Sequence, residues 1–211
     1  MNTPPFPTAP DAPDAQDVLH FWLGDGLQRG WCSDNRDALW FGGGPELDES
    51  IRQRFGPLVD SAMDGGLQDW EAQTPTRLAL VLLLDQFSRN IYRGQARAFA
   101  GDQRAQQLVR QTLASGLDDQ MATVGRVFLY MPLVHAEDLA SQDESVARFQ
   151  HLLDRSPPEL NETLARNLHF AKLHRDIVLR FGRFPHRNAA LGRTSTAEEL
   201  AFLKDGPRFG Q

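Results

Sequence analysis

The chain has 211 residues, of which 41% are hydrophobic and 24% charged, a composition typical of one folded domain with a sizeable core. Its formal net charge of −6 argues against general nucleic-acid binding, which depends on a basic face that neutralises phosphates. No run of about 18 apolar residues occurs, so the sequence predicts no membrane-spanning helix.

The first 13 residues are rich in proline and lack the basic and apolar regions of a secretory signal. They are predicted to form a disordered leader, followed by a single helical domain over residues 14–211. The one cysteine, Cys32, cannot form an internal disulfide, so nothing in the sequence requires an oxidising compartment. A cytoplasmic protein is therefore expected.

Helical periodicity and capping signals recur along the rest of the chain, whereas no alternating strand pattern of convincing length does. Helices are predicted over 14–24, 47–66, 74–87, 102–116, 121–131, 135–155, 158–181 and 195–206. Gly56-Pro57 is expected to kink or split the second helix, Pro132 to end the fifth, and a capping box of Thr196 and Glu199 to begin the last. The fold class is therefore all-α, an array of about eight antiparallel helices.

The helix over 74–87 is predicted to lie at the centre of the array. Thr74 is its expected N-cap, and Pro75 suits the first helical position. The segment from Leu78 to Leu84 is apolar on every side, which is typical of a helix that is buried all round.

A polar segment, "DQFSRNIYRGQAR" (85–97), follows directly on this buried segment. If the helix continues, Asp85 and Arg89 are neighbours one turn apart, and Gln86, Asn90 and Arg93 lie along nearly the same face. Either the helix emerges at a cavity or surface, or Asp85 and Arg89 form an internal ion pair that satisfies both charges.

A second polar segment, "RFGRFPHRN" (180–188), holds three arginines and a histidine. Gly182 should end a helix in the left-handed conformation, and Pro185 should extend the backbone at Phe184. Arg180, Arg183, His186 and Arg187 then face a common hollow, or the arginines cap the carboxyl ends of helices. We expect the two polar segments to meet in space.

A third segment, "YMPLVHAEDLASQ" (130–142), places Tyr130 at the end of one helix and His135, Glu137 and Asp138 at the start of the next. A histidine beside two acids could act as a general acid and base. The helix dipole alone would also favour acids at this position. No histidine or cysteine spacing typical of a metal site occurs, and no cofactor is predicted.

Long stretches of the chain resemble an uncharacterised bacterial family, domain of unknown function 924. They are "VLHFWLG", "LWFGGGPELDESIRQRF", "LLDQFSRNIYRG", "FLYMPLVHAEDLASQ" and "RFGRFPHRNAALGRTSTAEELAFL". The resemblance covers about residues 17–205 and implies a tetratricopeptide-like helical fold, an α-α superhelix. It implies no established activity.

Three functions are consistent with these residues. The first is a binding module whose arginine-lined groove holds a small anion or an acidic peptide. The second is an enzyme acting on a small anionic substrate, with His135 or His186 as acid and base. The third is a structural protein in which the polar segments only hold helices together. The candidate ligand-binding residues are Asp85, Gln86, Arg89, Asn90, Arg93, Tyr130, His135, Arg183, His186 and Arg187.

Overall fold

The structure, a computed structural model, describes residues 13–207 and is all-α, with ten α-helices and no strand in that range. The leader predicted for residues 1–13 lies outside the described residues except for Pro13. The helices are α1 (Ala15–Leu23), α2 (Gly26–Arg29), α3 (Pro45–Met63), α4 (Thr74–Leu82), α5 (Ser88–Ile91), α6 (Asp102–Ala114), α7 (Thr123–Val134), α8 (Leu139–Arg155), α9 (Asn161–Phe181) and α10 (Ala197–Asp205). The all-α prediction is confirmed, while the tetratricopeptide-like arrangement stays a prediction.

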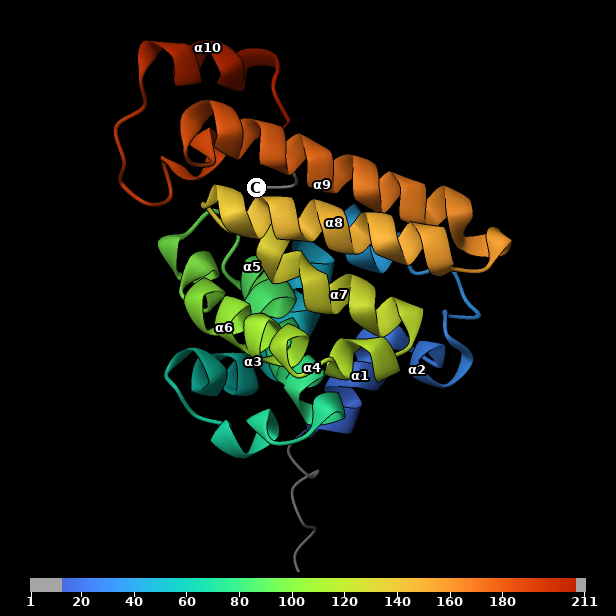
Figure 1. Ribbon diagram of the computed structural model, residues 1–211. Coiled ribbons are helices and arrows are strands. Elements are labelled where there is room, and N and C mark those ends of the chain that lie inside the picture. The colour runs from blue at the N-terminus through green and yellow to red at the C-terminus, as the bar shows by residue number, and fades with distance from the viewer. Residues whose placement is uncertain (1–12, 208–211) are drawn as a thin grey trace, which may run out of the picture.

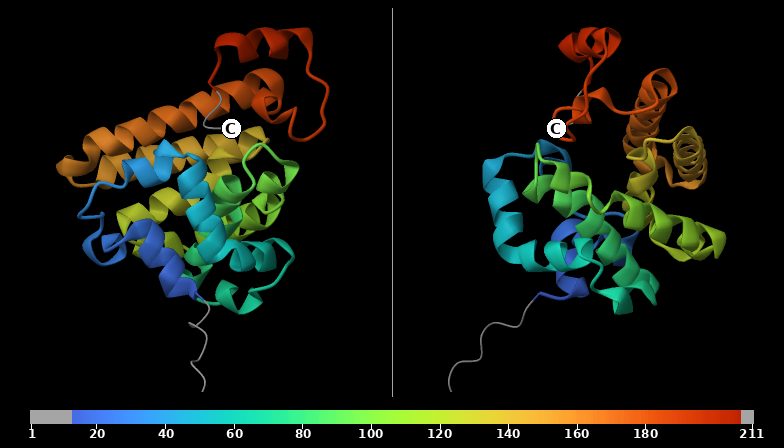
Figure 2. Two further views of the ribbon diagram at one scale, coloured as in Figure 1. Left: turned by 180° about the vertical axis from the view of Figure 1, so that it is seen from behind. Right: turned by 90° about the vertical axis from the view of Figure 1, so that its left-hand side faces the viewer.

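The long helices α8 and α9 lie side by side along one edge of the molecule, with α10 beyond them (Figure 1). Helices α1 to α7 form the body of the protein on the other side of α8 (Figure 2). α7 packs against α8 and joins this body to the α8–α9 pair.

Helix α4 lies at the centre of the body and contacts α1, α6 and α7. Every residue from Leu78 to Leu84 is at most 1% exposed, as predicted from the apolar character of this segment on all sides. The first helical residue is Thr74 and the N-cap is Gln73, whose backbone is extended, so the N-cap prediction was wrong by one position.

The helical path continues beyond α4 through a single π-helical turn, Leu83–Phe87, directly into α5. The N–H of Ser88 bonds to the carbonyl of Leu83, five residues back rather than four. Asp85 lies in this wider turn, directly after the apolar segment, and Arg89 lies in the short helix α5 that follows.

Pro57 does not split its helix and Pro132 does not end its helix, contrary to prediction, while the kink allowed for at Gly56-Pro57 stays a prediction. Pro57 lies inside an unbroken α3, and Pro132 lies inside α7, which continues to Val134. Each proline removes one backbone hydrogen bond. Fully buried side chains on both sides of Pro57, and buried residues beyond Pro132, hold the helices against their neighbours despite that loss.

Helix α8 begins four residues later than predicted. Its N-cap is Asp138, whose side chain accepts the N–H of Ser141 at 2.8 Å. Residues 135–138 therefore form the link between α7 and α8, and Glu137 lies outside the first turn of the helix. Its position before the helix leaves its carboxylate available for contacts with another part of the chain.

The end of α9, the residues that follow it and α10 form the C-terminal part of the molecule, which has a small core of its own. α9 ends at Gly182, which is left-handed with φ 69° as predicted, and Phe184 is fully buried on an extended backbone. Ile177, Val178 and Phe184 form this second core, against which the half-buried Phe181 and Phe202 pack. The capping box of Thr196 and Glu199 at the start of α10 is confirmed.

Candidate functional site

Polar side chains from six separate segments converge between the body and the C-terminal part. They come from the π-helical turn, α5, the start of α6, the α7–α8 link, α9 and the turn that follows α9. We call this group the polar cluster, and its members are Asp85, Arg89, Asp102, His135, His174, His186 and Arg187.

Asp85 forms the acidic centre of one side of the cluster and is completely buried. Its carboxylate lies 3.3 Å from the Arg89 guanidinium and 2.8 Å from Nδ1 of His135, and it accepts a hydrogen bond from the Gln86 amide at 2.6 Å. Burial alone would raise the pKa of Asp85. Arg89 and then His135 outweigh it and hold that pKa well below the usual range, so Asp85 is ionised.

Asp102, the first residue of α6, joins the two polar segments. Its Oδ2 accepts a hydrogen bond from Arg89 at 2.9 Å and one from Nη1 of Arg187 at 3.4 Å. Both guanidinium groups also lie over the Phe99 ring, at 5.6 Å and 4.7 Å from its centroid. The prediction that residues 85–90 and 180–188 meet is therefore confirmed through an acid that the sequence analysis did not single out.

Arg187 is the least satisfied charge of the cluster. It is 5% exposed, and its guanidinium stacks between Phe99 and Phe184, 4.6 Å from the centroid of the latter. Within residues 13–207, the one hydrogen bond of the guanidinium is the long contact to Asp102, and the buried Nε atom has no partner. Burial, followed by the nearby charge of Arg89, lowers the pKa of Arg187 to about 10.

Three histidines occupy the remaining side of the cluster. The rings of His135 and His174 are 6.0 Å apart, and those of His174 and His186 lie 5.5 Å and 5.4 Å from Phe184. Burial lowers the pKa of all three, to about 3 for His174 and about 3 for His186. The three histidines are therefore neutral in the folded protein, and Arg89 and Arg187 carry the positive charge of the polar cluster.

The backbone around His135 is held from both sides. The buried amide of Gln142 in α8 donates to the carbonyls of Val134 at 2.6 Å and Ala136 at 2.7 Å. One side chain thus holds the carbonyls of the two residues next to His135 in the sequence. The ring is kept against Asp85 by its own hydrogen bond and by this anchored link.

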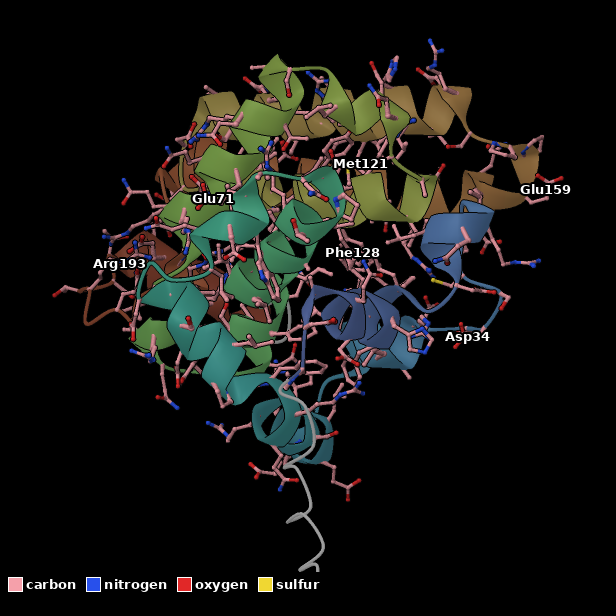
Figure 3. All side chains as sticks on the ribbon, turned by 90° about the horizontal axis from the view of Figure 1, so that it is seen from below. Asp34, Glu71, Met121, Phe128, Glu159 and Arg193 are labelled. Carbon is pink, nitrogen blue, oxygen red and sulfur yellow. The ribbon has the colours of Figure 1, made fainter. Side chains whose placement is uncertain are left out.

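An ion pair between Glu137 and Arg193 connects the α7–α8 link to the segment that follows α9. Glu137 accepts two hydrogen bonds from Arg193, at 2.7 Å and 2.9 Å, and a third from the backbone N–H of Phe184 at 2.8 Å. Arg193 marks this end of the molecule in Figure 3, opposite the end where Glu159 lies. Glu137 therefore ties the segment before Arg187 to the segment that carries His135.

The remaining predicted residues have partners elsewhere. Arg183 donates to both carboxylate oxygens of Glu199, at 2.7 Å and 2.9 Å, and does not contact Arg89. Asn90 and Arg93 both bond to Asp48 of α3, and Tyr130 donates to the buried Asp118 at 2.7 Å. The structure thus brings together Asp85, Gln86, Arg89, His135, His186 and Arg187 of the ten predicted residues.

Comparison with known proteins assigns the chain to a family. Residues 18–207 match the family described as bacterial protein of unknown function (DUF924). The chain belongs to this family. The stretch matched is close to the one expected from the resemblance of the sequence motifs.

A solved structure of a protein of unknown function from Agrobacterium tumefaciens has a similar fold. It is 36% identical to this chain, with a TM-score of 0.74, over 91% of this chain and 97% of the other. No curated protein matches. The family and the similar solved structure therefore support the fold and leave function to be argued from the site.

Other candidate sites differ from the cluster. A cavity of about 490 Å³ opens between the start of α7 and the end of α8, and none of the predicted residues lines it. Its lining is Asp119, Thr123, Arg126, His151, Leu152, Arg155 and Ser156. No group of three or more metal-ligating side chains in the part of the chain that the structure describes is placed to hold a metal ion. No helix there is both long and apolar enough to cross a bilayer.

Proposed function

We propose that this protein binds a small anion, or the carboxylate of an acidic peptide, at the polar cluster. The observation that carries the proposal is the buried guanidinium of Arg187, whose Nε atom has no partner within residues 13–207. An arginine that is buried without full hydrogen bonding is costly, because it has lost its water and not replaced it.

The charge distribution around Arg187 supports an anion in particular. Asp102 is shared between two arginines, and Arg89 already has closer contacts to it than Arg187 does. The Phe99 and Phe184 rings lie 4.7 Å and 4.6 Å from the centre of the Arg187 guanidinium, whose N–H bonds all point outward in its own plane. In that plane a carboxylate or phosphate oxygen pair can accept two parallel N–H bonds.

The proposal is tested by anion binding to matched arginine variants. We expect phosphate or simple carboxylates to raise the melting temperature of the wild-type protein in proportion to occupancy, and Arg187→Gln to abolish that shift. Arg180→Gln is the control, because Arg180 lies in the same segment with a side chain that is 54% exposed and paired to Glu198. Wild-type protein that responds to none of these anions would favour the structural reading of the cluster.

A second candidate function, catalysis, is favoured by the 2.8 Å contact between Asp85 and Nδ1 of His135. A carboxylate in this position orients the ring and stabilises the charge that a general base acquires. His135 suits this role better than His186, whose ring lies against Phe184 and whose pKa burial lowers to about 3.

Hydrolysis of p-nitrophenyl acetate and p-nitrophenyl phosphate offers a first test of catalysis. A general base contributes roughly 100- to 10,000-fold, so His135→Asn and Asp85→Asn should both remove any turnover that the wild-type protein shows. Turnover that survives both substitutions would rule out this pair as its source.

A further inference from the structure

The ionised Asp85 determines which nitrogen of His135 carries the proton. An ionised carboxylate can only accept hydrogen bonds, so Nδ1 of His135 must be the donor in the 2.8 Å contact. Arg89 keeps Asp85 ionised, because its guanidinium lies 3.3 Å from the same carboxylate. In the neutral ring the other nitrogen, Nε2, is then a lone-pair acceptor.

This acceptor points away from the Asp85 side of the cluster. Nδ1 and Nε2 lie on different edges of the imidazole ring, and the contact to Asp85 is the one hydrogen bond of the His135 ring within residues 13–207. The His135 side chain keeps 13% of its surface exposed, compared with 1% for Asp85. The ring edge that carries Nε2 is thus without a hydrogen bond to the protein within residues 13–207, on a side chain that is not completely buried.

The cluster thus presents two groups of opposite hydrogen-bonding character. Arg187 has a buried N–H donor that lacks a partner, and His135 has an acceptor without a protein donor among the described residues. Two chains of contacts connect them. One runs through Asp85, Arg89 and Asp102, and the other runs through His174 and Phe184.

A simple carboxylate or a fully ionised phosphate satisfies only one of these groups. Such anions accept hydrogen bonds and donate none, so they can pair with Arg187 and leave Nε2 of His135 without a donor. Building on the proposed function, we infer that the ligand is an anion with its own O–H or N–H donor, and that a small hydroxy acid is the simplest member of this class. Its carboxylate pairs with Arg187, and its hydroxyl donates to His135.

The anchoring of His135 supports selection by this hydroxyl. Gln142 holds the carbonyls of Val134 and Ala136, the neighbours of His135 in the sequence, and Asp85 holds the ring. An acceptor fixed in this way cannot turn to find another donor when the ligand lacks one. A site built around a hydroxyl discriminates strongly against the analogue without it, because its own polar group is left unpaired.

Matched pairs of acids that differ by one hydroxyl test the inference. Binding of glycolate against acetate, and of L-malate against succinate, is measured by calorimetry on the wild-type protein. We expect the hydroxy acid of at least one pair to bind about tenfold more tightly than its partner. Equal binding within both pairs would overturn this inference and leave the proposed anion site standing, whereas no binding of any of the four would remove the anion site itself.

Two variants and one spectrum connect that preference to His135. His135→Phe removes the acceptor and should equalise each pair while keeping the affinity for acetate or succinate. Asp85→Asn should also reduce the preference, because an amide no longer imposes the Nδ1–H form of the ring. Nitrogen-15 NMR of the wild-type protein reads the tautomer directly, so a protonated Nε2 would overturn the inference even if a variant fails to fold.

Discussion

Two arginine sites only a few residues apart show how differently the same side chain can be used. Arg183 makes two short hydrogen bonds to Glu199, which also accepts the N–H of Thr196 at 2.7 Å. Arg187 is more deeply buried yet has one long contact to an acid that it shares with Arg89. We call the first group the Glu199 network, with members Arg183, Asn188, Thr196 and Glu199.

The difference lies in how completely each charge is satisfied. The Glu199 network pairs its carboxylate with a bidentate arginine and a helix cap, so nothing in it calls for a ligand. The polar cluster leaves a donor of Arg187 without a partner among the described residues. The number of arginines in a segment is therefore a poor guide to function, and the completeness of their hydrogen bonding is a better one.

Removal of Asp102 should have the largest effect, because one substitution takes a partner from both Arg89 and Arg187. We expect Asp102→Ala to lower the free energy of unfolding by about 3–5 kcal/mol in urea denaturation, the usual cost of leaving a buried charge unpaired. Asp37→Ala is the matched control, since its ion pair with Arg166 joins side chains that are 47% and 44% exposed. That control should cost less than about 1 kcal/mol. Equal losses for both variants would contradict the description of Asp102 as a bridge.

As the pH falls, protonation should destabilise the polar cluster at a higher pH than it destabilises the Glu199 network. The pKa values of His174 and His186 are lowered by burial from 6.5 to about 3, so the unfolded chain binds protons below pH 6.5 that the folded protein does not. Stability should therefore be fully present above pH 6.5 and fall as the pH drops towards 3. The loss is about 1 kcal/mol for each histidine between pH 6.5 and 5.5.

Melting temperatures across this pH range check the origin of the acid sensitivity. His174→Phe should make the decline shallower, because one proton fewer is taken up on unfolding. His151→Asn is the control, since His151 is exposed and lies outside the polar cluster. Protonation of Glu199, whose pKa its Arg183 partner lowers to about 2, should contribute only below about pH 4.5.

The smallest effect should come from the cap within the Glu199 network. The side chain of Thr196 accepts the N–H of Glu199 at 3.1 Å, and loss of such a cap typically costs about 1 kcal/mol. We expect Thr196→Ala to lower the urea midpoint accordingly and to leave anion binding at the polar cluster unchanged. A loss of anion binding in this variant would show that the two sites are not separable.

Local features of the fold were predictable because their causes lie within a few residues. The left-handed Gly182 and the capping box at Thr196 depend on neighbours in the sequence, and both are confirmed. The burial of Leu78 to Leu84 follows from the absence of any polar face. The prolines misled because packing further along α3 and α7 outweighs one lost backbone bond.

The site was only half predictable for a related reason. Asp85 and Arg89 are one turn apart, so their pairing could be anticipated from spacing. Asp102 lies 85 residues from Arg187 and resembles any acid at the start of a helix, so nothing local marks it as their shared partner. His174 lies within a long helix with no local signal of its place in the cluster, and Arg183 was predicted in the site because its pairing with Glu199 is a tertiary contact that the sequence does not reveal.

The separate small core beneath α10 has a consequence for the timing of ligand exchange. Ile177, Val178 and Phe184 pack apart from the main core, so this end of the molecule opens more readily than the segment around α4. Arg187 is only three residues beyond Phe184, and the same opening exposes its guanidinium to water. If the proposed anion binds Arg187, its residence time should depend on how often this small core opens. Tighter packing at the half-buried positions Phe181 and Phe202 should then slow both entry and release.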